Sequence, residues 1–131
     1  MSCPSSIYTV VTNATVAGGA QGPYGAIIRR FGRSVQLDGQ GINLLGTGYY
    51  DLEASLTFTP TATGPVTIQF FQDGIAVPGA VATAQATASE PSNLYVTALV
   101  RNCACDCNSS LTYTVSAAGT IVNLATRVAK E

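Results

Sequence analysis

Residues 49–59, which read YYDLEASLTFT, decide the fold class of this chain, because apolar and polar side chains alternate along them. The apolar set is Tyr50, Leu52, Ala54, Leu56 and Phe58, and the polar set is Asp51, Glu53, Ser55, Thr57 and Thr59. A period of two places each set on its own face of a β-strand, one face toward a core and the other toward solvent. The segment therefore predicts a long, half-buried strand.

The rest of the chain extends this pattern, with Gly, Pro, Asn and Asp marking the turns. Asp73-Gly74 is a two-residue hairpin signal, and Pro78-Gly79 predicts a second turn before an extended Ala80–Ala88. Ala26–Phe31 is short and ambiguous. Further strands are expected at Ile7–Val16, Ser34–Leu37, Ile42–Leu45, Val66–Gln72, Ile75–Val77, Leu94–Arg101, Leu111–Val115 and Thr120–Val128. The total is about eight to ten strands without a convincing helix, which predicts an all-β sandwich, jelly roll or barrel.

The apolar positions of these strands predict the core. The residues expected to fill it are Leu52, Leu56, Phe58, Ile68, Phe70, Val96 and Val100. A chain of 131 residues has the length of one domain, so we expect residues 1–131 to form a single unit around this core.

Charge is unusually sparse. Only 10% of residues are charged, whereas soluble domains average roughly 25%. Such a surface suits a structural subunit that completes its burial in an assembly. Leu45, Tyr49 and Phe71 are apolar residues on or beside the polar register of their strands, and we predict that they line an oligomer interface.

The same totals argue against several partners. The formal net charge is −1, and Arg29, Arg30 and Arg33 form the one local basic cluster, so nucleic acid binding is not expected. No stretch approaches the ~20 consecutive apolar residues of a membrane-spanning helix. The segment from Met1 to Ser6 lacks the layout of a signal peptide, which favours synthesis in a bacterial cytoplasm.

Enzymatic chemistry is not expected. The chain has no histidine to serve as a general base. Asp51 and Glu53 share one strand face, but a solvated face or an ion pair with arginine is the favoured interpretation of such a pair. No catalytic residue and no cofactor are therefore assigned.

The cysteines are the one reactive set. Cys103, Cys105 and Cys107 alternate, and Cys3 lies near the start of the sequence. Three interpretations stay open: reduced thiols in a loop, a disulfide such as Cys3 with one of the other three, or a soft metal held by Cys103, Cys105 and Cys107. Zinc sites usually show C-x₂₋₄-C pairs with a second pair or histidines, which this chain lacks, so no metal is assigned.

Three segments carry a resemblance to a known family. Residues 48–58 (GYYDLEASLTF), 66–79 (VTIQFFQDGIAVPG) and 120–130 (TIVNLATRVAK) resemble strands of the tumour-necrosis-factor/complement-type jelly roll, also found in small phage and prophage virion proteins and in heads of bacterial collagen-like surface proteins. The resemblance covers residues 35–131. Residues 1–30, an early strand and a Gly-rich loop, match it in that strand alone, and no Gly-X-Y stalk is present.

The resemblance implies a fold and an assembly. It implies a compact jelly roll that packs three copies around an apolar axis, hence a homotrimer. It also raises calcium as an option, with Asp38, Asp73 or Asp106 as ligands, although no D-x-D-x-D cluster exists.

The expected function is structural. We expect a virion protein, a phage capsid decoration or head-fibre trimer that contacts itself and capsid or fibre proteins. The alternative is an adhesive head on a fibre or cell surface that binds a carbohydrate, such as a host glycan, or a receptor, with Tyr24 as an exposed loop-tip contact. A monomeric immunoglobulin-like sandwich is a further alternative.

Overall fold

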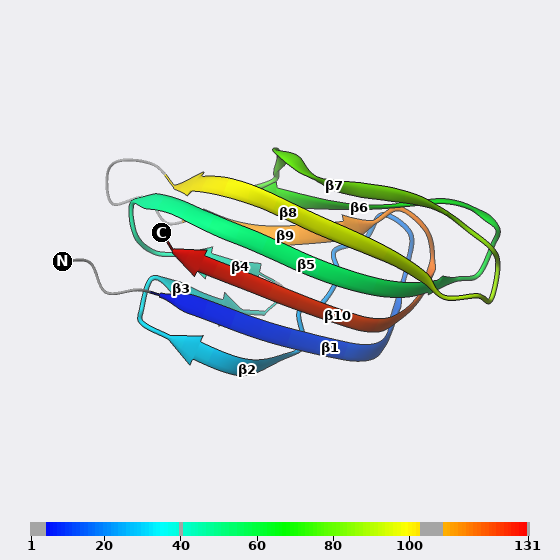
Figure 1. Ribbon diagram of the computed structural model, residues 1–131, viewed down its shortest axis with the longest axis horizontal. Helices are drawn as coiled ribbons and strands as arrows, with labels where there is room; N and C mark the ends of the chain where they lie inside the picture. The colour runs from blue at the N-terminus through cyan, green and yellow to red at the C-terminus, as the bar shows by residue number, and fades with distance from the viewer. Residues whose placement is uncertain (1–4, 40, 103–108, 131) are drawn as a thin grey trace.

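The chain folds into antiparallel strands joined by short turns (Figure 1). A computed structural model describes residues 5–39, 41–102 and 109–130, and these ranges contain ten strands and no helix. The strands are β1 (Ser6–Val16), β2 (Ala26–Phe31), β3 (Val35–Asp38), β4 (Gly41–Leu44), β5 (Gly48–Pro60), β6 (Gly64–Gln72), β7 (Ile75–Ala86), β8 (Ser92–Asn102), β9 (Ser109–Val115) and β10 (Gly119–Lys130). Within these ranges, then, nothing helical is long and apolar enough to cross a membrane.

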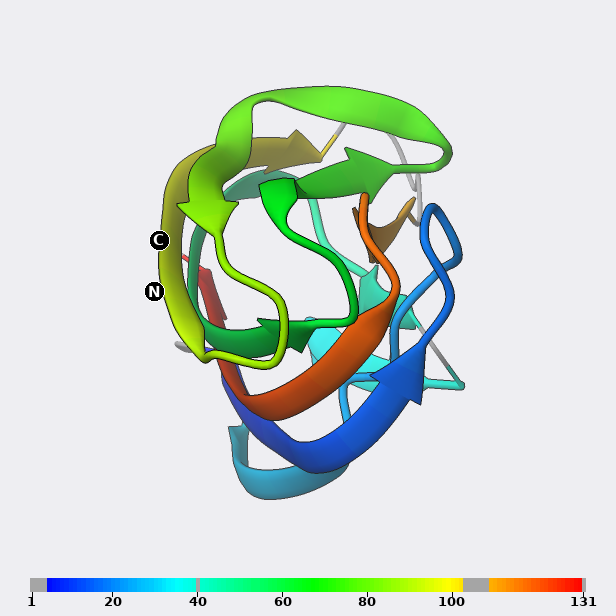
Figure 2. The same ribbon diagram turned by 90° about the vertical axis from the view of Figure 1, so that its right-hand side faces the viewer.

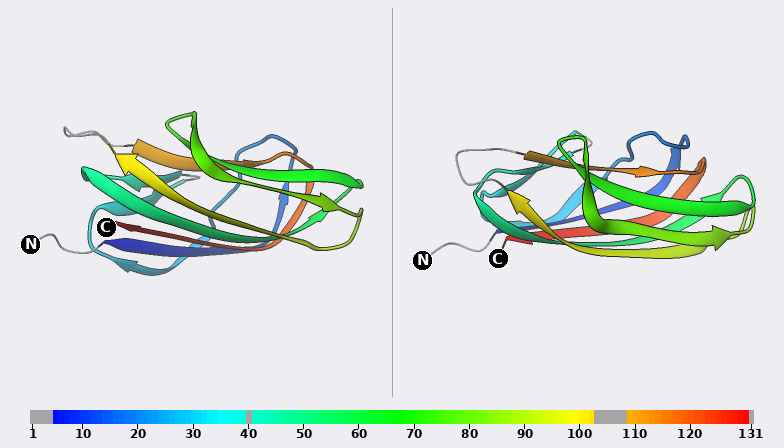
Figure 3. Two further views of the ribbon diagram at one scale, coloured as in Figure 1. Left: turned by 45° about the horizontal axis from the view of Figure 1, so that its top comes forward. Right: turned by 90° about the horizontal axis from the view of Figure 1, so that it is seen from above.

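The strands form two five-stranded sheets. Sheet A has the order β2-β1-β10-β5-β8, and sheet B has the order β3-β4-β9-β6-β7. Viewed along the strands, the two sheets curve around a common interior, with β8 beside β7 at one edge (Figure 2). The two views of Figure 3 show that the long strands of both sheets run along the long axis of the molecule. The arrangement confirms the predicted all-β sandwich.

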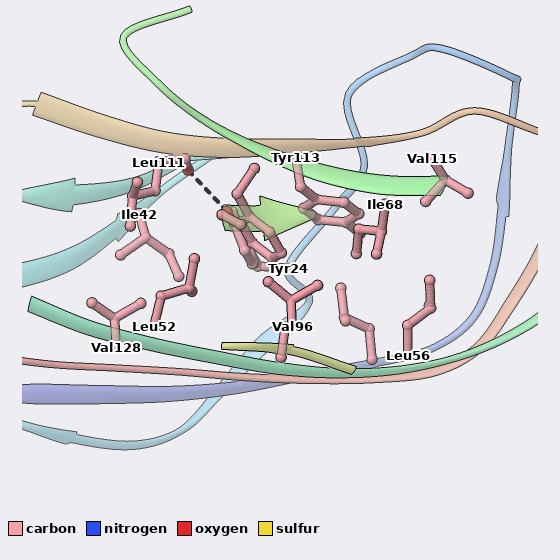
Figure 4. Packing of buried hydrophobic residues seen from close by; sticks show 14 of the residues in the cluster. Tyr24, Ile42, Leu52, Leu56, Ile68, Val96, Leu111, Tyr113, Val115 and Val128 are labelled. Carbon is pink, nitrogen blue, oxygen red and sulfur yellow. Dashed lines mark hydrogen bonds between the residues drawn. The ribbon is translucent and has the colours of Figure 1, made fainter. Parts of the chain in front are cut away.

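The core lies between the sheets because alternate residues of every long strand point inward. In β5 the burial pattern alternates along its whole length, as the sequence predicts. All seven predicted core residues are buried: Leu52, Leu56, Phe58, Ile68, Phe70, Val96 and Val100. Figure 4 shows side chains of both sheets meeting in this layer, among them Leu52 and Leu56 from sheet A and Ile68 from sheet B. Their removal from water is the main favourable term for the fold.

One expectation about strand limits is wrong, and one segment that the sequence left ambiguous is assigned by the structure. The chain does not turn at Pro78-Gly79, because β7 continues from Ile75 to Ala86. Gly79 adopts a positive φ of 82°, and the pairing with β6 shifts register between Gln69 and Phe71, so the strand kinks there and then continues. The ambiguous Ala26–Phe31 is a strand, paired with β1 at the edge of sheet A.

The prediction that Tyr24 is an exposed loop-tip residue is wrong. Its side chain is 1% exposed and lies between the sheets (Figure 4). The Tyr24 hydroxyl donates a hydrogen bond of 3.0 Å to the carbonyl oxygen of Leu111, and its ring meets that of Tyr113 edge to face. The Tyr113 hydroxyl in turn donates to the carbonyl oxygen of Pro23. The Gly-rich loop is therefore fastened to the core, and Tyr24 has no access to a ligand.

Burial of these two phenols predicts a loss of stability at high pH. Desolvation raises the pKa of Tyr24 and of Tyr113 well above 10, whereas an unfolded tyrosine titrates near 10. Both phenols thus stay protonated in the folded chain while the unfolded chain releases its protons. Their contribution is complete below about pH 10 and is lost as the pH rises toward the folded-state pKa, by about 1.4 kcal/mol per pH unit for each phenol.

Urea unfolding at pH 9, 10 and 11 measures this effect. The midpoint is expected to fall with pH, and Tyr24→Phe is expected to make the fall shallower. Tyr49→Phe, which keeps the ring and removes a hydroxyl that is about half exposed in the single chain, is the matched control at the same protein concentration. A midpoint that stays constant over this range in the parent chain would contradict the burial of the two phenols.

Candidate self-association surface

The outer face of sheet A carries several large apolar side chains. Tyr8 of β1 is 37% exposed, Tyr49 of β5 48%, and Tyr95 and Leu99 of β8 60% and 53%. They point outward because their strand neighbours at alternate positions fill the core. We call this set, with the small residues between its members, the tyrosine face.

Small side chains separate the tyrosines. The strand register places Val10, Ala125, Ser55 and Tyr95 in one row across β1, β10, β5 and β8. Tyr8 begins the next row, so the tyrosines of β1 and β8 are three strand spacings apart across the sheet and two residues apart along it, about 16 Å in all. Ala125 and Ser55 lie on the floor between them. The result is a shallow hollow of about 190 Å³ with aromatic walls.

One ion pair crosses this floor. A guanidinium nitrogen of Arg127 lies 3.4 Å from a carboxylate oxygen of Glu53, and both side chains are about half exposed. Because both side chains are exposed to water, this ion pair contributes little to stability, at most about 1 kcal/mol. A partner that covered this ion pair would remove water from both charges. Only a partner in a register that supplies matching polar or charged groups would then be favoured.

The outer face of sheet B differs in kind. Hydroxyls and amides cover its centre, for example Thr67 and Thr83, whose Oγ1 atoms lie 2.9 Å apart across β6 and β7. The Gln69 amide nitrogen folds onto backbone carbonyls, including that of Phe70 at 2.8 Å. The polar groups at the centre of this face bond to one another or to the backbone, and its exposed large apolar side chains, Ile75 and Val81, lie on the edge strand β7.

Comparison with solved structures supports the topology described above. Murine APRIL at pH 5.0 superposes with a TM-score of 0.76 at 12% identity, covering 98% of this chain and 99% of that chain. PRD1 vertex protein P5 gives 0.69 at 13% identity, with 99% of each chain covered. The globular domain of zebrafish complement 1qA gives 0.63 at 6% identity, covering 98% and 95%.

The fold is a jelly roll of the tumour-necrosis-factor/complement type. At these identities the likeness is one of fold. No protein-family model and no curated protein matches the sequence itself.

The jelly roll does not bring the three predicted interface residues together. Tyr49 lies on the tyrosine face, whereas Phe71 is half-buried on the outer face of sheet B. Leu45 is half-buried just after β4, and its N–H donates to the carbonyl oxygen of Ser34 at 2.8 Å. Of the three, Tyr49 stays a candidate for the interface.

Sequence reasoning missed Tyr8, Tyr95 and Leu99, although the signal was present. The prediction that Val96 and Val100 fill the core already places Tyr95 and Leu99 on the opposite face of the same strand. Apolar residues on both faces of a strand indicate that both faces are covered.

The structure also gives the contacts of two acidic residues that were considered for acid–base chemistry or calcium binding. Glu53 pairs with Arg127, as the ion-pair interpretation expected. The Asp73 carboxylate accepts a hydrogen bond of 2.9 Å from the backbone N–H of Ser110. No group of three or more His, Cys, Asp or Glu side chains suited to a metal occurs in the described ranges. Asp106 and the candidates Cys103, Cys105 and Cys107 lie outside them, as does Cys3.

A buried network fixes the end of the sandwich where β8 passes to β9. The Asn102 amide donates to the carbonyl oxygens of Leu44 at 3.2 Å and Gly46 at 2.9 Å, and its own oxygen accepts from the Ser109 hydroxyl at 2.9 Å. The Gln72 amide adds bonds to the Arg101 carbonyl oxygen and to the Ser109 hydroxyl. These bonds join sheet A to sheet B at this end.

Proposed function

We propose that the protein is a structural component of a virion, a phage capsid decoration or head-fibre protein that assembles as a homotrimer through the tyrosine face. The observation that carries the proposal is this exposed apolar surface on a chain with so few charges. Burial of one large apolar side chain contributes about 1.5–3 kcal/mol. Four such side chains in each copy supply a strong drive to associate.

Two further observations support the proposal. The fold is shared over nearly the whole chain with a phage vertex protein, PRD1 P5. The resemblance noted in the sequence implies three copies around an apolar axis, and the tyrosine face offers aromatic side chains for such an axis. Capsid or fibre proteins would then be the further partners, and the chain would be made in the bacterial cytoplasm and act in the particle.

A structural role also agrees with the chemistry of the site. The tyrosine face holds aromatic rings, small side chains and one satisfied ion pair, and the chain has no histidine. Nothing in this set activates a nucleophile or a water molecule. We therefore propose no catalytic activity.

Light scattering after size exclusion tests the assembly. The expected mass is three times the 13.4 kDa of one chain, with and without reductant. A clean monomer would remove the support for a trimer. Mass spectrometry of purified particles whose genome encodes the chain tests the location: the chain should be present at a stoichiometry that is a multiple of three, and its absence would contradict a virion role.

An adhesive head is the second candidate, favoured by a second hollow. It measures about 380 Å³ and lies between the β6–β7 turn and β8, with Asp73, Ile75, Leu99 and Arg101 among its lining residues. Apolar side chains beside a carboxylate and a guanidinium suit a carbohydrate or receptor contact. Binding on a glycan array that Asp73→Ala abolishes would favour adhesion over passive decoration.

A further inference from the structure

Strand β2 is the least covered of the ten strands in the described ranges. All six of its residues are exposed, whereas the edge strands β3, β7 and β8 each bury at least one residue. It hydrogen-bonds to β1 on one side alone, since it ends the order of sheet A. In Figure 2 it lies at the bottom of the sandwich, beyond β1.

An edge strand of this kind presents a template for another strand. Alternate N–H and C=O groups of β2 point away from β1, in the plane of the sheet, with no strand to receive them in the described part of the chain. Large apolar side chains flank this edge: Ile27 is 41% exposed, Ile28 54% and Phe31 60%. With Ser6 and two arginines, Ile28 and Phe31 line an open hollow of about 470 Å³.

The charged residues at this edge are all positive, which favours an acidic partner. Arg29 and Arg30 belong to β2 and Arg33 follows it, while residues 26–37 contain no acidic residue. Within the described ranges no carboxylate forms an ion pair with any of the three. The edge therefore combines hydrogen-bonding groups, apolar side chains and uncompensated positive charge.

We propose that β2 binds an extended acidic segment of a partner protein, which adds as a sixth strand to sheet A and places carboxylates on Arg29 and Arg30. Main-chain hydrogen bonds supply affinity in strand addition, and side chains supply specificity. A second copy of this chain is a poor occupant, because pairing two β2 strands gathers three arginines from each copy. A polyanion is also a poor occupant, because it leaves Ile27, Ile28 and Phe31 in water.

This inference does not depend on the tyrosine face. The free groups of β2 point sideways, within the plane of sheet A, whereas Tyr8 and Tyr95 point out of that plane. Strand addition at β2 and self-association through the tyrosine face can therefore take place together.

Arg29 and Arg30 are consecutive and point to opposite faces of sheet A, so the test peptide needs carboxylates on both of its faces. A labelled, terminally blocked octapeptide in which pairs of glutamates alternate with pairs of valines tests the proposal with the full-length chain, by fluorescence anisotropy and amide hydrogen exchange. We expect binding and slowed exchange within residues 26–31. Arg29→Glu/Arg30→Glu should weaken binding at least about tenfold. Arg101→Glu, at the opposite edge of sheet A, is the matched control and should leave binding unchanged.

Two further peptides separate strand addition from simple charge attraction. The peptide with lysine for glutamate should not bind. The peptide with proline for valine keeps its charge but cannot extend a sheet, and it should also fail. Absence of binding by the parent peptide, or equal binding by the proline peptide, would overturn the proposal. So would preferential binding of a single-stranded oligonucleotide, or a concentration-dependent dimer that Arg29→Glu/Arg30→Glu changes.

Discussion

Tyr95→Lys is expected to convert the assembled protein into a monomer of 13.4 kDa, a threefold fall in mass measured by light scattering. Tyr95 is 60% exposed on β8, and its neighbours in the same row across sheet A are the small residues Ser55 and Ala125. Its ring therefore projects farther from the sheet than these neighbours. Large aromatic anchors in an interface cost about 2 kcal/mol or more when removed. A lysine ammonium adds the cost of desolvating a charge, once in each copy.

The control for this variant is Asn43→Lys. Asn43 belongs to β4 and faces outward from sheet B, because Ile42 and Leu44 on either side of it are buried. This change adds the same charge to the opposite side of the sandwich and should leave the mass unchanged. If Tyr95→Lys kept the parent mass and fold, self-association through the tyrosine face would be wrong.

Phe58→Ala is expected to lower the free energy of unfolding by about 3–5 kcal/mol, the usual cost of deleting a buried aromatic ring. Phe58 is fully buried in β5 beside Ile121 of β10. Its ring lies so near Gly119 that a Cβ there would approach Phe58 Cζ within 2.8 Å, so the ring occupies the space that Gly119 leaves. Removing the ring opens a cavity at the point where β5, β10 and the turn before β10 meet.

Urea unfolding at one fixed protein concentration measures this change, because the midpoint of an associating protein depends on concentration. Thr59→Ala is the matched control: it is the next residue of β5 and points to the opposite face. We expect a change within about 0.5 kcal/mol for this surface substitution. Equal effects of the two substitutions would contradict the alternation on which the fold assignment rests.

The strands that alternate cleanly could be predicted from the sequence, because burial of one sheet face imposes period two. β5, β6, β8, β9 and β10 lie within a few residues of their expected positions. β2 could not be assigned, because both of its faces are exposed and its residues show no alternation. The continuation of β7 through Pro78-Gly79 was not predicted. Proline and glycine occur both at kinks within a strand and at turns between strands, so the residue types do not distinguish the two.

The candidate site was less predictable than the fold. Tyr49 was identified because it stands beside a strongly alternating segment, but Tyr8 and Tyr95 join it through pairing between distant strands. Tyr24 was misassigned, because the partner that buries its hydroxyl, the Leu111 carbonyl oxygen, is 87 residues away. Residue type and spacing carry no information on such contacts.

The position of β1 and β10 has a consequence for biosynthesis. These strands come from opposite ends of the described chain, yet they pair side by side within sheet A, and β10 also pairs with β5. A ribosome releases β1 long before β10, so sheet A stays divided into two parts, β2-β1 and β5-β8, until β10 emerges to join them. Sheet A should therefore close only once β10 has left the ribosome, and until then the facing edges of β1 and β5 stay unpaired and prone to aggregation.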